Sequence, residues 1–378
     1  MKIERCVWHE DGGWQEPIDP LADRRSANLV LVFAAPTLLK EPSRLREIQM
    51  RFPKAAVCGC STAGEIAGTR VLDDSFTAAA LAFETSTVVT VDEAITSSSE
   101  SFDVGRRLAE RLPKDGLVHT LVLSDGLKVN GARPAAGIAG GLPQGVAVTG
   151  GLSGDGDRFK ETLVVNHGVA RSGHVVLIGF YGANLRIGFG SMGGWDSFGP
   201  ERRITRSQDN ILYELDGCSA LDLYKEYLGD HAAKLPASGL LFPLTVRRDK
   251  SEETLVRTIL AVDETNHSLT FAGDVPQGSF ARLMRANFDR LVDGATGAAQ
   301  KSRLKLGQKT QFALLVSCVG RKLVLGPRIE EEVEAVTDVL GTASVGGFYS
   351  YGEISPVAPN ASCQLHNQTM TITTFSEV

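Results

Sequence analysis

Two short glycine-rich turns that each end in Gly-Glu-Ile are the parts of this chain best suited to bind a ligand. They are residues 59–66 (GCSTAGEI) and 347–354 (GFYSYGEI), with a weaker copy, GGLSGD, at 150–155. A carboxylate that follows a glycine turn can be held by main-chain N–H groups and can receive an ammonium or amide group from a ligand. The competing interpretation is that each carboxylate caps a helix or fastens its own turn.

The small and polar residues of the three turns would surround a small ligand if the turns meet at one cleft. The predicted ligand-binding residues are Cys60, Ser61, Thr62, Gly64, Glu65, Gly151, Asp155, Tyr349, Tyr351, Gly352 and Glu353. The repeated Gly-Glu-Ile ending favours Glu65 and Glu353 most. The aromatic residues of the last turn suit either stacking on a flat or cationic ligand or packing between domains.

Histidines could supply the axial ligand of a haem, which requires an imidazole in an apolar pocket. Of the seven histidines, His366 is the first candidate because it lies beside an apolar strand near the C-terminal turn. His174 is the second candidate because it precedes the apolar run Val175 to Leu177. The competing interpretation of His366 is an imidazole that is hydrogen-bonded within its own turn.

Other kinds of chemistry find little support in the sequence. Cys58 and Cys60 are one residue apart, whereas zinc ligand pairs are usually two to four residues apart and need a second pair. Residues 188–193 (GFGSMG) match GxGxxG, but no helix is predicted to follow, as a dinucleotide site requires. Ser61 and Ser124 are candidate nucleophiles of a hydrolase, but no GxSxG motif accompanies them. The sequence therefore favours a binding protein over an enzyme.

Alternating strands and helices must position the three turns. Each turn follows an apolar run, and these runs are Leu29 to Ala34, Leu121 to Ser124 and Leu314 to Ser317. A stretch that can form a helix separates each run from its turn, and another strand-like run follows the turn. This unit is typical of α/β proteins.

Further along the chain, helix signals and a change of pattern predict a second domain. Residues 219–228 should form a helix with Ser219 as N-cap and Gly229 just beyond its end. Residues 280–291 have the apolar spacing of an amphipathic helix. We expect a domain boundary near residue 205, and an irregular N-terminal arm over residues 1–27.

Composition narrows the class of protein. The 378 residues suggest two domains, and the net charge of −6 argues against nucleic acid as the main partner. No apolar stretch reaches the roughly 20 residues needed to span a membrane, and the N-terminus does not resemble a secretory signal. The six cysteines are scattered, as is typical of reduced thiols in a cytoplasmic protein.

The motifs resemble those of the FIST proteins, which carry a FIST N-terminal and a FIST C-terminal domain. Residues 57–66 (VCGCSTAGEI) and 150–155, with Phe159 and Thr162 after them, are similar to conserved stretches of the N-terminal domain. Residues 317–321 (SCVGR) and 347–354 resemble the hallmark of the C-terminal domain. The resemblance covers the chain from about residue 28 to its end.

The resemblance implies a sensory protein of signal transduction that binds a small ligand. One branch of the family consists of stand-alone nitric-oxide-sensing proteins that carry haem b and regulate a histidine kinase or a cyclic-di-GMP enzyme in trans, and residues 363–371 resemble the C-terminal end of that branch. The alternatives are a haem-free amino-acid or metabolite sensor, an unrecognised hydrolase, and a scaffold without a ligand. No membrane or nucleic-acid partner is expected, and a homodimer is compatible with the large β content.

We therefore predict an α/β fold with two FIST domains related by an internal pseudo-repeat, in which helices cover mixed β-sheets. The predicted divisions are the arm at 1–27, the FIST N-terminal domain at 28–205 and the FIST C-terminal domain at 206–378.

Overall fold

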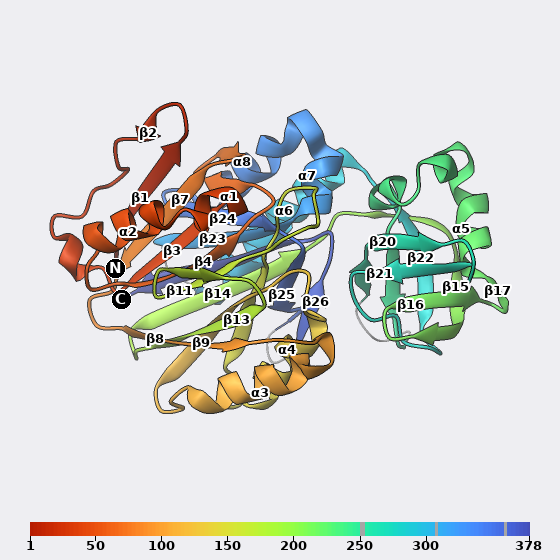
Figure 1. Ribbon diagram of the computed structural model, residues 1–378, viewed down its shortest axis with the longest axis horizontal. Coiled ribbons are helices and arrows are strands. Elements are labelled where there is room, and N and C mark those ends of the chain that lie inside the picture. The colour runs from red at the N-terminus through yellow and green to blue at the C-terminus, as the bar shows by residue number, and fades with distance from the viewer. Residues whose placement is uncertain (250–253, 307–308, 359–360) are drawn as a thin grey trace.

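A large body and a smaller β-rich lobe make up the molecule, as Figure 1 shows. The computed structural model describes residues 1–249, 254–306, 309–358 and 361–378. The body contains both termini, and the lobe is formed by the strands from β15 (Asp196–Gln208) to β22 (Phe280–Arg285). The lobe is thus an insertion between two segments of the body.

Three β-sheets, of seven, six and six strands, build the body. The four main strands of each sheet follow the same order. In each, a central strand lies between a parallel and an antiparallel neighbour, and a fourth strand follows the antiparallel one. In this order, the strands are β3 (Leu29–Ala34), β4 (Ala56–Ser61), β7 (Phe76–Ala82) and β1 (Lys2–His9); β9 (Leu117–Ser124), β10 (Ala147–Leu152), β13 (His174–Tyr181) and β8 (Thr87–Ala94); and β23 (Phe312–Cys318), β24 (Ser344–Ser350), β27 (Met370–Glu377) and β14 (Leu185–Met192). The first arrangement also carries β2 (Gly13–Trp14) on β1.

A β-hairpin follows the parallel strand of each unit but pairs with the sheet of another unit. Hairpin β5–β6 follows β4 and pairs with β24, β11–β12 follows β10 and pairs with β4, and β25–β26 follows β24 and pairs with β10. The hairpin strands are β5 (Glu65–Ala67), β6 (Arg70–Leu72), β11 (Val164–Asn166), β12 (Val169–Arg171), β25 (Gly352–Pro356) and β26 (Cys363–His366). The internal repeat is therefore threefold, and the exchange of hairpins closes it into a cycle.

The inner faces of the three sheets pack on one shared core. Phe33 of the first unit stacks on Phe348 of the third, with ring centroids 4.7 Å apart, and Leu123 of the second unit belongs to the same cluster. Helices cover the outer faces of the sheets, as predicted. They are α1 (Pro36–Lys40), α2 (Pro42–Arg51), α3 (Ser101–Arg111), α4 (Ala132–Gly140), α6 (Phe288–Leu306), α7 (Val319–Leu325) and α8 (Ile329–Leu340).

The N-terminal segment is a strand of the body rather than the irregular arm that we expected. Residues Lys2–Trp8 pair with β7 over their whole length. The strand was not predicted because the charged Glu4 lies on its buried side, where an apolar residue would be expected. Its carboxylate accepts hydrogen bonds from the guanidinium groups of Arg24 and Arg51 and from the Leu21 N–H, so the buried charge is paired.

The lobe has its own apolar core and a continuous antiparallel arrangement of strands. Its other elements are β16 (Ile211–Leu215), β17 (Cys218–Ser219), α5 (Ala220–Leu228), the 3-10 helices η3 (Gly229–Lys234) and η4 (Ala237–Leu241), β18 (Leu244–Arg247), β19 (Leu255–Arg257), β20 (Ile259–Asp263) and β21 (Ser268–Phe271). The predicted caps of α5 are confirmed: the Ser219 hydroxyl accepts a hydrogen bond from the Asp222 N–H, and Gly229 ends the helix.

Two sequence expectations differ from the folded chain. Residues 280–291 were expected to be one helix, but 280–285 form strand β22 and α6 begins at Phe288. Residue 205 lies inside β15, and hairpins β5–β6 and β25–β26 pair across the expected division. The sheets of the body therefore combine residues from both predicted domains.

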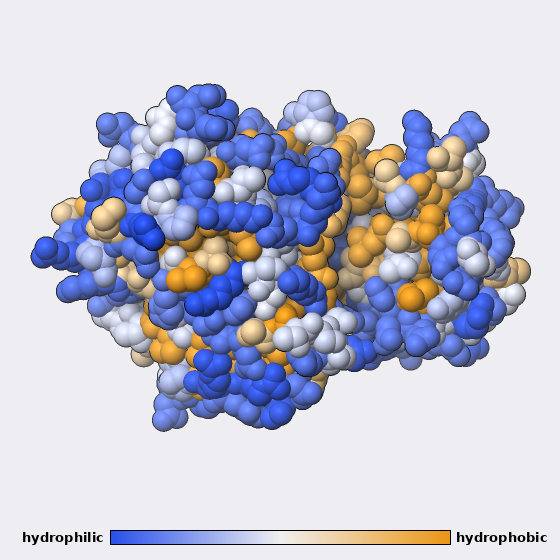
Figure 2. All heavy atoms as spheres, viewed as in Figure 1, coloured by the Kyte–Doolittle hydropathy of each residue, from blue (hydrophilic) through white to orange (hydrophobic). Residues whose placement is uncertain are grey.

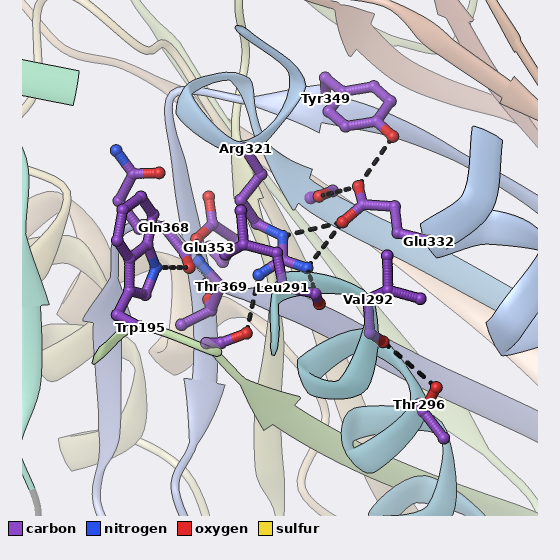
Figure 3. A network of polar contacts seen from close by, with 12 residues as sticks. Trp195, Leu291, Val292, Thr296, Arg321, Glu332, Tyr349, Glu353, Gln368 and Thr369 are labelled. Carbon is purple, nitrogen blue, oxygen red and sulfur yellow. Dashed lines mark hydrogen bonds and ion pairs between the residues drawn. The ribbon is translucent and has the colours of Figure 1, made fainter. Parts of the chain in front are cut away.

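A buried guanidinium fastens both connections between the body and the lobe (Figure 3). Arg321 donates to the carbonyl oxygen of Gly193, just before the lobe begins, at 2.8 Å, and to that of Leu291, just after it ends, at 2.7 Å. The same guanidinium pairs with the buried Glu332, at 2.6 Å from Nη2 to Oε2. The Glu332 carboxylate also accepts hydrogen bonds from Ser317 and Tyr349, so the whole network is paired.

We expect Arg321→Met to lower the free energy of unfolding by about 3–5 kcal/mol, because it leaves the Glu332 carboxylate buried without its cation. The double variant Arg321→Met/Glu332→Gln should recover part of this loss, since an amide can still accept from Ser317 and Tyr349. Urea unfolding followed by circular dichroism would measure both effects. An unchanged unfolding midpoint for Arg321→Met would contradict the role given to this group.

Candidate functional site

The three glycine-rich turns contact one another through their main chains. The N–H of Gly154 donates to Ser61 O at 2.9 Å, that of Ala63 to Tyr349 O at 2.8 Å, and that of Tyr351 to Leu152 O at 3.3 Å. The turns thus lie together where the three units meet.

Glu65 and Glu353 face the interior of the protein, and their carboxylates fasten the exchanged hairpins. Glu65 accepts from the Thr62 hydroxyl and from both the N–H and the hydroxyl of Ser75, which precedes β7. Glu353 accepts in the same way from Ser350 and from Thr369, which precedes β27. Both side chains are at most 1% exposed, so a ligand has no path to them in this conformation.

Burial changes the acid–base properties of these two carboxyl groups. Desolvation raises the pKa of Glu65 from 4.5 to about 7, although the hydrogen bonds from Ser75 and Thr62 act to lower it. Desolvation likewise raises the pKa of Glu353 to about 8, against hydrogen bonds from Ser350 and Thr369. Both carboxyl groups therefore keep their protons to higher pH in the folded protein than in the unfolded chain.

The remaining predicted ligand-binding residues are also buried in the body. The Ser61 hydroxyl accepts from the Leu163 N–H at 2.9 Å, and Cys60 lies in the core shared by the sheets. A Cβ on Gly151 would lie 2.6 Å from the Val316 side chain, so glycine is required by packing there. Gly64, Gly352, Thr62 and Tyr349 are likewise buried. Ligand binding by these residues stays a prediction.

Asp155 and Tyr351 are buried, but they hold the exposed Phe159, and Tyr351 and Phe159 line a cavity. The Asp155 carboxylate accepts from the Tyr351 hydroxyl and from the main-chain N–H groups of Phe159, Lys160 and Glu161 at 2.8–3.0 Å. The Phe159 ring stacks on Tyr351 at 4.4 Å between centroids and is 42% exposed. Asp155 thereby orders the loop that carries Phe159.

Beside this stacked pair lies a cavity of about 420 Å³ between the body and the lobe. The body contributes residues at the carboxyl ends of its parallel strands, among them Gly126, Leu152, Cys318 and Tyr351, and the lobe contributes Asn210, Leu240, Thr258, Leu260 and Phe271. Figure 2 shows apolar residues gathered along this junction. We name this space the junction cavity.

A second, larger cavity of about 1150 Å³ lies between α4, β26 and the lobe strands β18 and β19. Its lining includes Arg257, whose guanidinium donates to the main-chain oxygens of Asp274 and Leu365 at 3.0 and 3.1 Å. Desolvation lowers the pKa of Arg257 to about 10. Arg257 belongs to the lobe and Leu365 to the body, so this side chain connects the two parts.

The predicted haem ligands do not face either cavity. His366 is buried, and its Nε2 lies 2.9 Å from the Ser355 carbonyl oxygen, while burial lowers its pKa to about 4. His174 is half-buried, with Nδ1 3.0 Å from the Ser172 carbonyl oxygen. The described lining of both cavities contains no histidine. Within the described chain, no cluster of three or more His, Cys, Asp or Glu is arranged to hold a metal ion. The residues present therefore do not fit an axially ligated haem in these cavities.

Sequence reasoning missed the lobe side of the junction cavity. Thr258 and Leu260 lie in a mostly apolar run, residues 255–262 (LVRTILAV), and nothing in this sequence indicates that they face the body. Phe159 was noted only as part of a motif. Phe159 lies two residues after Asp157 in a polar, glycine-containing segment. A surface loop is the expected structure of such a segment, so the sequence could have indicated that this aromatic ring is exposed.

The pH dependence of stability should report the buried carboxyl groups. The folded protein keeps protons on Glu65 and Glu353 at pH values where the unfolded chain has released them, so stability falls as pH rises toward about 8. Between pH 6.5 and 8, we expect a loss of roughly 2 kcal/mol. The variant Glu65→Gln/Glu353→Gln should show a flatter profile. Urea unfolding at a series of pH values tests this, and equal slopes for both proteins would refute it.

Replacing Asp155 by Ala should loosen residues 156–161, because three N–H groups and the Tyr351 hydroxyl lose their common acceptor. Each bond to a charged acceptor contributes about 1.5–3 kcal/mol. Hydrogen–deuterium exchange should show faster exchange in this loop. The exposed Asp157 provides the control through Asp157→Ala. Protection that stays the same in Asp155→Ala would count against the assignment.

Comparison with known proteins agrees with this architecture. The FIST N domain family matches residues 28–218, and the FIST C domain family matches residues 220–356. No curated protein matches the chain. In the described residues, no helix has both the length and the apolar character to cross a membrane. FIST domains are sensory domains of signal transduction that bind small ligands. The match to the FIST N domain covers half of the chain and the second match adjoins it, so this protein belongs to the FIST family.

Proposed function

We propose that this protein is a cytoplasmic sensor that binds a small metabolite in the junction cavity and reports it in trans to a histidine kinase or a cyclic-di-GMP enzyme. The family supplies the sensory role and the small ligand. The observation that carries the choice of site is the junction cavity itself, which body and lobe line together. In open α/β sheets, ligands bind at the carboxyl ends of strands, where this cavity lies.

A ligand in the junction cavity would contact two parts of the molecule that are joined by few polar bonds. Across the junction, Asn130 bonds Asp274, Arg133 bonds Asp209, and Arg257 bonds the Leu365 carbonyl. A ligand that contacts both sides stabilises the closed arrangement relative to a more open one. The partner would then recognise the position of the lobe. A homodimer remains compatible with this proposal.

Among the versions predicted from the sequence, the haem-free metabolite sensor has the better geometric support. Haem-dependent nitric oxide sensing through His366 would require that imidazole to leave its bond to Ser355 and reach a cavity that it does not line. Amino-acid binding by Glu65 and Glu353 would require opening of the fastened turns. The junction cavity requires neither change.

A hydrolase mechanism has no comparable support. The Ser61 hydroxyl accepts from a main-chain N–H, and the Ser124 hydroxyl donates to the Asp125 carbonyl oxygen. Both side chains are fully buried. A nucleophilic serine needs a base within hydrogen-bond reach and access to substrate. FIST domains are sensory rather than catalytic, which agrees with a binding role.

Ligand binding should depend on the lobe wall of the junction cavity. We expect Leu260→Lys to abolish the thermal stabilisation that a bound compound gives, because it places a cation in an apolar wall. The measurement is a thermal-shift screen with free amino acids, purines, pyrimidines and aromatic metabolites. Leu323→Lys is the matched control, since Leu323 is similarly exposed (44% against 45%) but does not line the cavity.

Two results of this screen would contradict the proposal. One is stabilisation by a compound that both variants retain equally, which would place the ligand elsewhere. The other is a Soret band in the absorption spectrum of protein mixed with haem that is lost in His366→Ala, which would restore the haem version.

A further inference from the structure

We infer that the ligand of the junction cavity is a neutral, flat aromatic molecule that carries one hydrogen-bonding group. This inference rests on the proposed function and names the class of compound that the site selects. Three features of the lining support it: the exposed ring of Phe159, the ion pair between Arg133 and Asp209, and the Thr258 hydroxyl, which has no hydrogen-bond partner among the described residues.

The exposed ring belongs to Phe159, which offers a surface for stacking. One face of this ring covers Tyr351 at a nearly parallel angle of 15°, and the side chain is 42% exposed at the edge of the cavity. A flat ligand on the open face would extend the stack by one ring. Stacked aromatic pairs contribute about 0.5–1.5 kcal/mol beyond the burial of area.

The main chain at Phe159 is held in an unusual conformation that keeps the ring in this place. Its φ is +51°, in the left-handed region that bulky residues rarely adopt. The Asp155 carboxylate enforces it through the N–H groups of Phe159, Lys160 and Glu161. Strain of this kind persists where the surrounding structure over-determines it, often at ligand contacts.

The charges of the cavity favour a neutral ligand. In the described lining, the charged residues are Arg133 and Asp209, which pair with each other at 2.9 Å. The remaining side chains are apolar or uncharged. An ionised group buried here would lose hydration without gaining an opposite charge, which costs several kcal/mol.

The hydrogen-bonding group of the ligand has a candidate partner in Thr258. This residue lines the junction cavity from the lobe side and is 4% exposed. Its hydroxyl has no hydrogen-bond partner among the described residues. A buried hydroxyl without a partner is costly, and a polar atom of the ligand at this wall would satisfy it once a rotation about χ1 turns the hydroxyl toward the cavity.

The larger cavity has the opposite character, which makes the charge argument testable. Its lining includes Arg248 and Arg257 together with Arg133 and Arg247, which pair with Asp209 and Glu201, and the described acidic residue of the lining is Asp274. Anionic compounds should therefore prefer that cavity to the junction cavity. Probes that differ only in charge or flatness will separate the two sites.

The test is isothermal titration of the full-length protein with three matched probes. These are 2-naphthol, which is neutral and flat, decahydro-2-naphthol, which is neutral but not flat, and 2-naphthoate, which is flat but charged. We expect 2-naphthol to bind about two- to tenfold more tightly than the decahydro compound, because of stacking. We expect 2-naphthoate to bind the junction cavity at least tenfold more weakly than 2-naphthol.

Variants assign the binding to this cavity. Phe159→Leu should weaken 2-naphthol binding about two- to tenfold and should erase the preference over the decahydro compound. Phe288→Leu is the matched control, since Phe288 is an aromatic residue of similar exposure that lines neither cavity, and it should leave binding unchanged.

Thr258→Val gives a signature that a purely structural role would not give. It should weaken 2-naphthol binding about three- to tenfold, yet raise the midpoint of unfolding of the ligand-free protein, because it removes an unpartnered buried hydroxyl. Loss of stability together with unchanged binding would overturn the role of Thr258. Equal affinity for all three probes, or no binding of 2-naphthol, would overturn the ligand class.

Failure of this inference and failure of the proposed function remain distinguishable. Cys218 is an exposed cysteine of the lobe, whereas the other five cysteines are buried, so dyes on Cys218 and on a body variant, Glu110→Cys, report the distance between lobe and body. If a charged or aliphatic metabolite changes energy transfer between the dyes and Leu260→Lys abolishes the change, the sensor proposal stands and the ligand class is wrong. If 2-naphthol binds without any change in energy transfer, the ligand class stands and the lobe mechanism is wrong.

Discussion

The buried guanidinium of Arg321 is the interaction on which the arrangement of body and lobe depends. A charge that is fully removed from water must find compensating partners, and Arg321 finds them in Glu332 and in two carbonyl oxygens (Figure 3). Those two carbonyls belong to the segments that lead into and out of the lobe. The cost of burying the guanidinium is thus offset by the ion pair with Glu332 and by hydrogen bonds to both connections of the lobe.

The close approach of these two segments explains several glycines at the base of the lobe. A Cβ on Gly294 would lie 1.7 Å from the Gly193 carbonyl oxygen, and one on Gly194 would lie 1.9 Å from that of Arg290. Tyr349, from the central turns, donates to the same Glu332 that pairs with Arg321. The centre of the body and the base of the lobe therefore share one hydrogen-bonded network.

The repeated Gly-Glu-Ile turns have a structural explanation that also accounts for their repetition. Each hairpin leaves its own unit to join another sheet, and in β5–β6 and β25–β26 a carboxylate near the start of the hairpin binds the residue just before the next strand. Glu65 and Glu353 do this in the first and third units. In the second unit, Asp125 binds the N–H of Gly173 before β13, while Asp155 orders the Phe159 loop. This position of the repeat therefore borders the junction cavity, where we propose that the ligand binds.

The sequence by itself determined the family, the α/β class, the repeat and the local signals, including the caps of α5, because these depend on residues close together in the chain. It also indicated that the three turns would meet. Only the tertiary structure decided which of their residues border a cavity: Glu65 and Glu353 are buried and hydrogen-bonded, while Tyr351 lines the junction cavity beside the exposed Phe159. The lobe wall at Thr258 and Leu260 could not be predicted, because a cavity between two parts of a fold is set by their packing and not by local pattern. The strand at Lys2–His9 could not be predicted for a related reason. A glutamate in sequence suggests an exposed position, and the partner that allows Glu4 to be buried, Arg51, is distant in the chain.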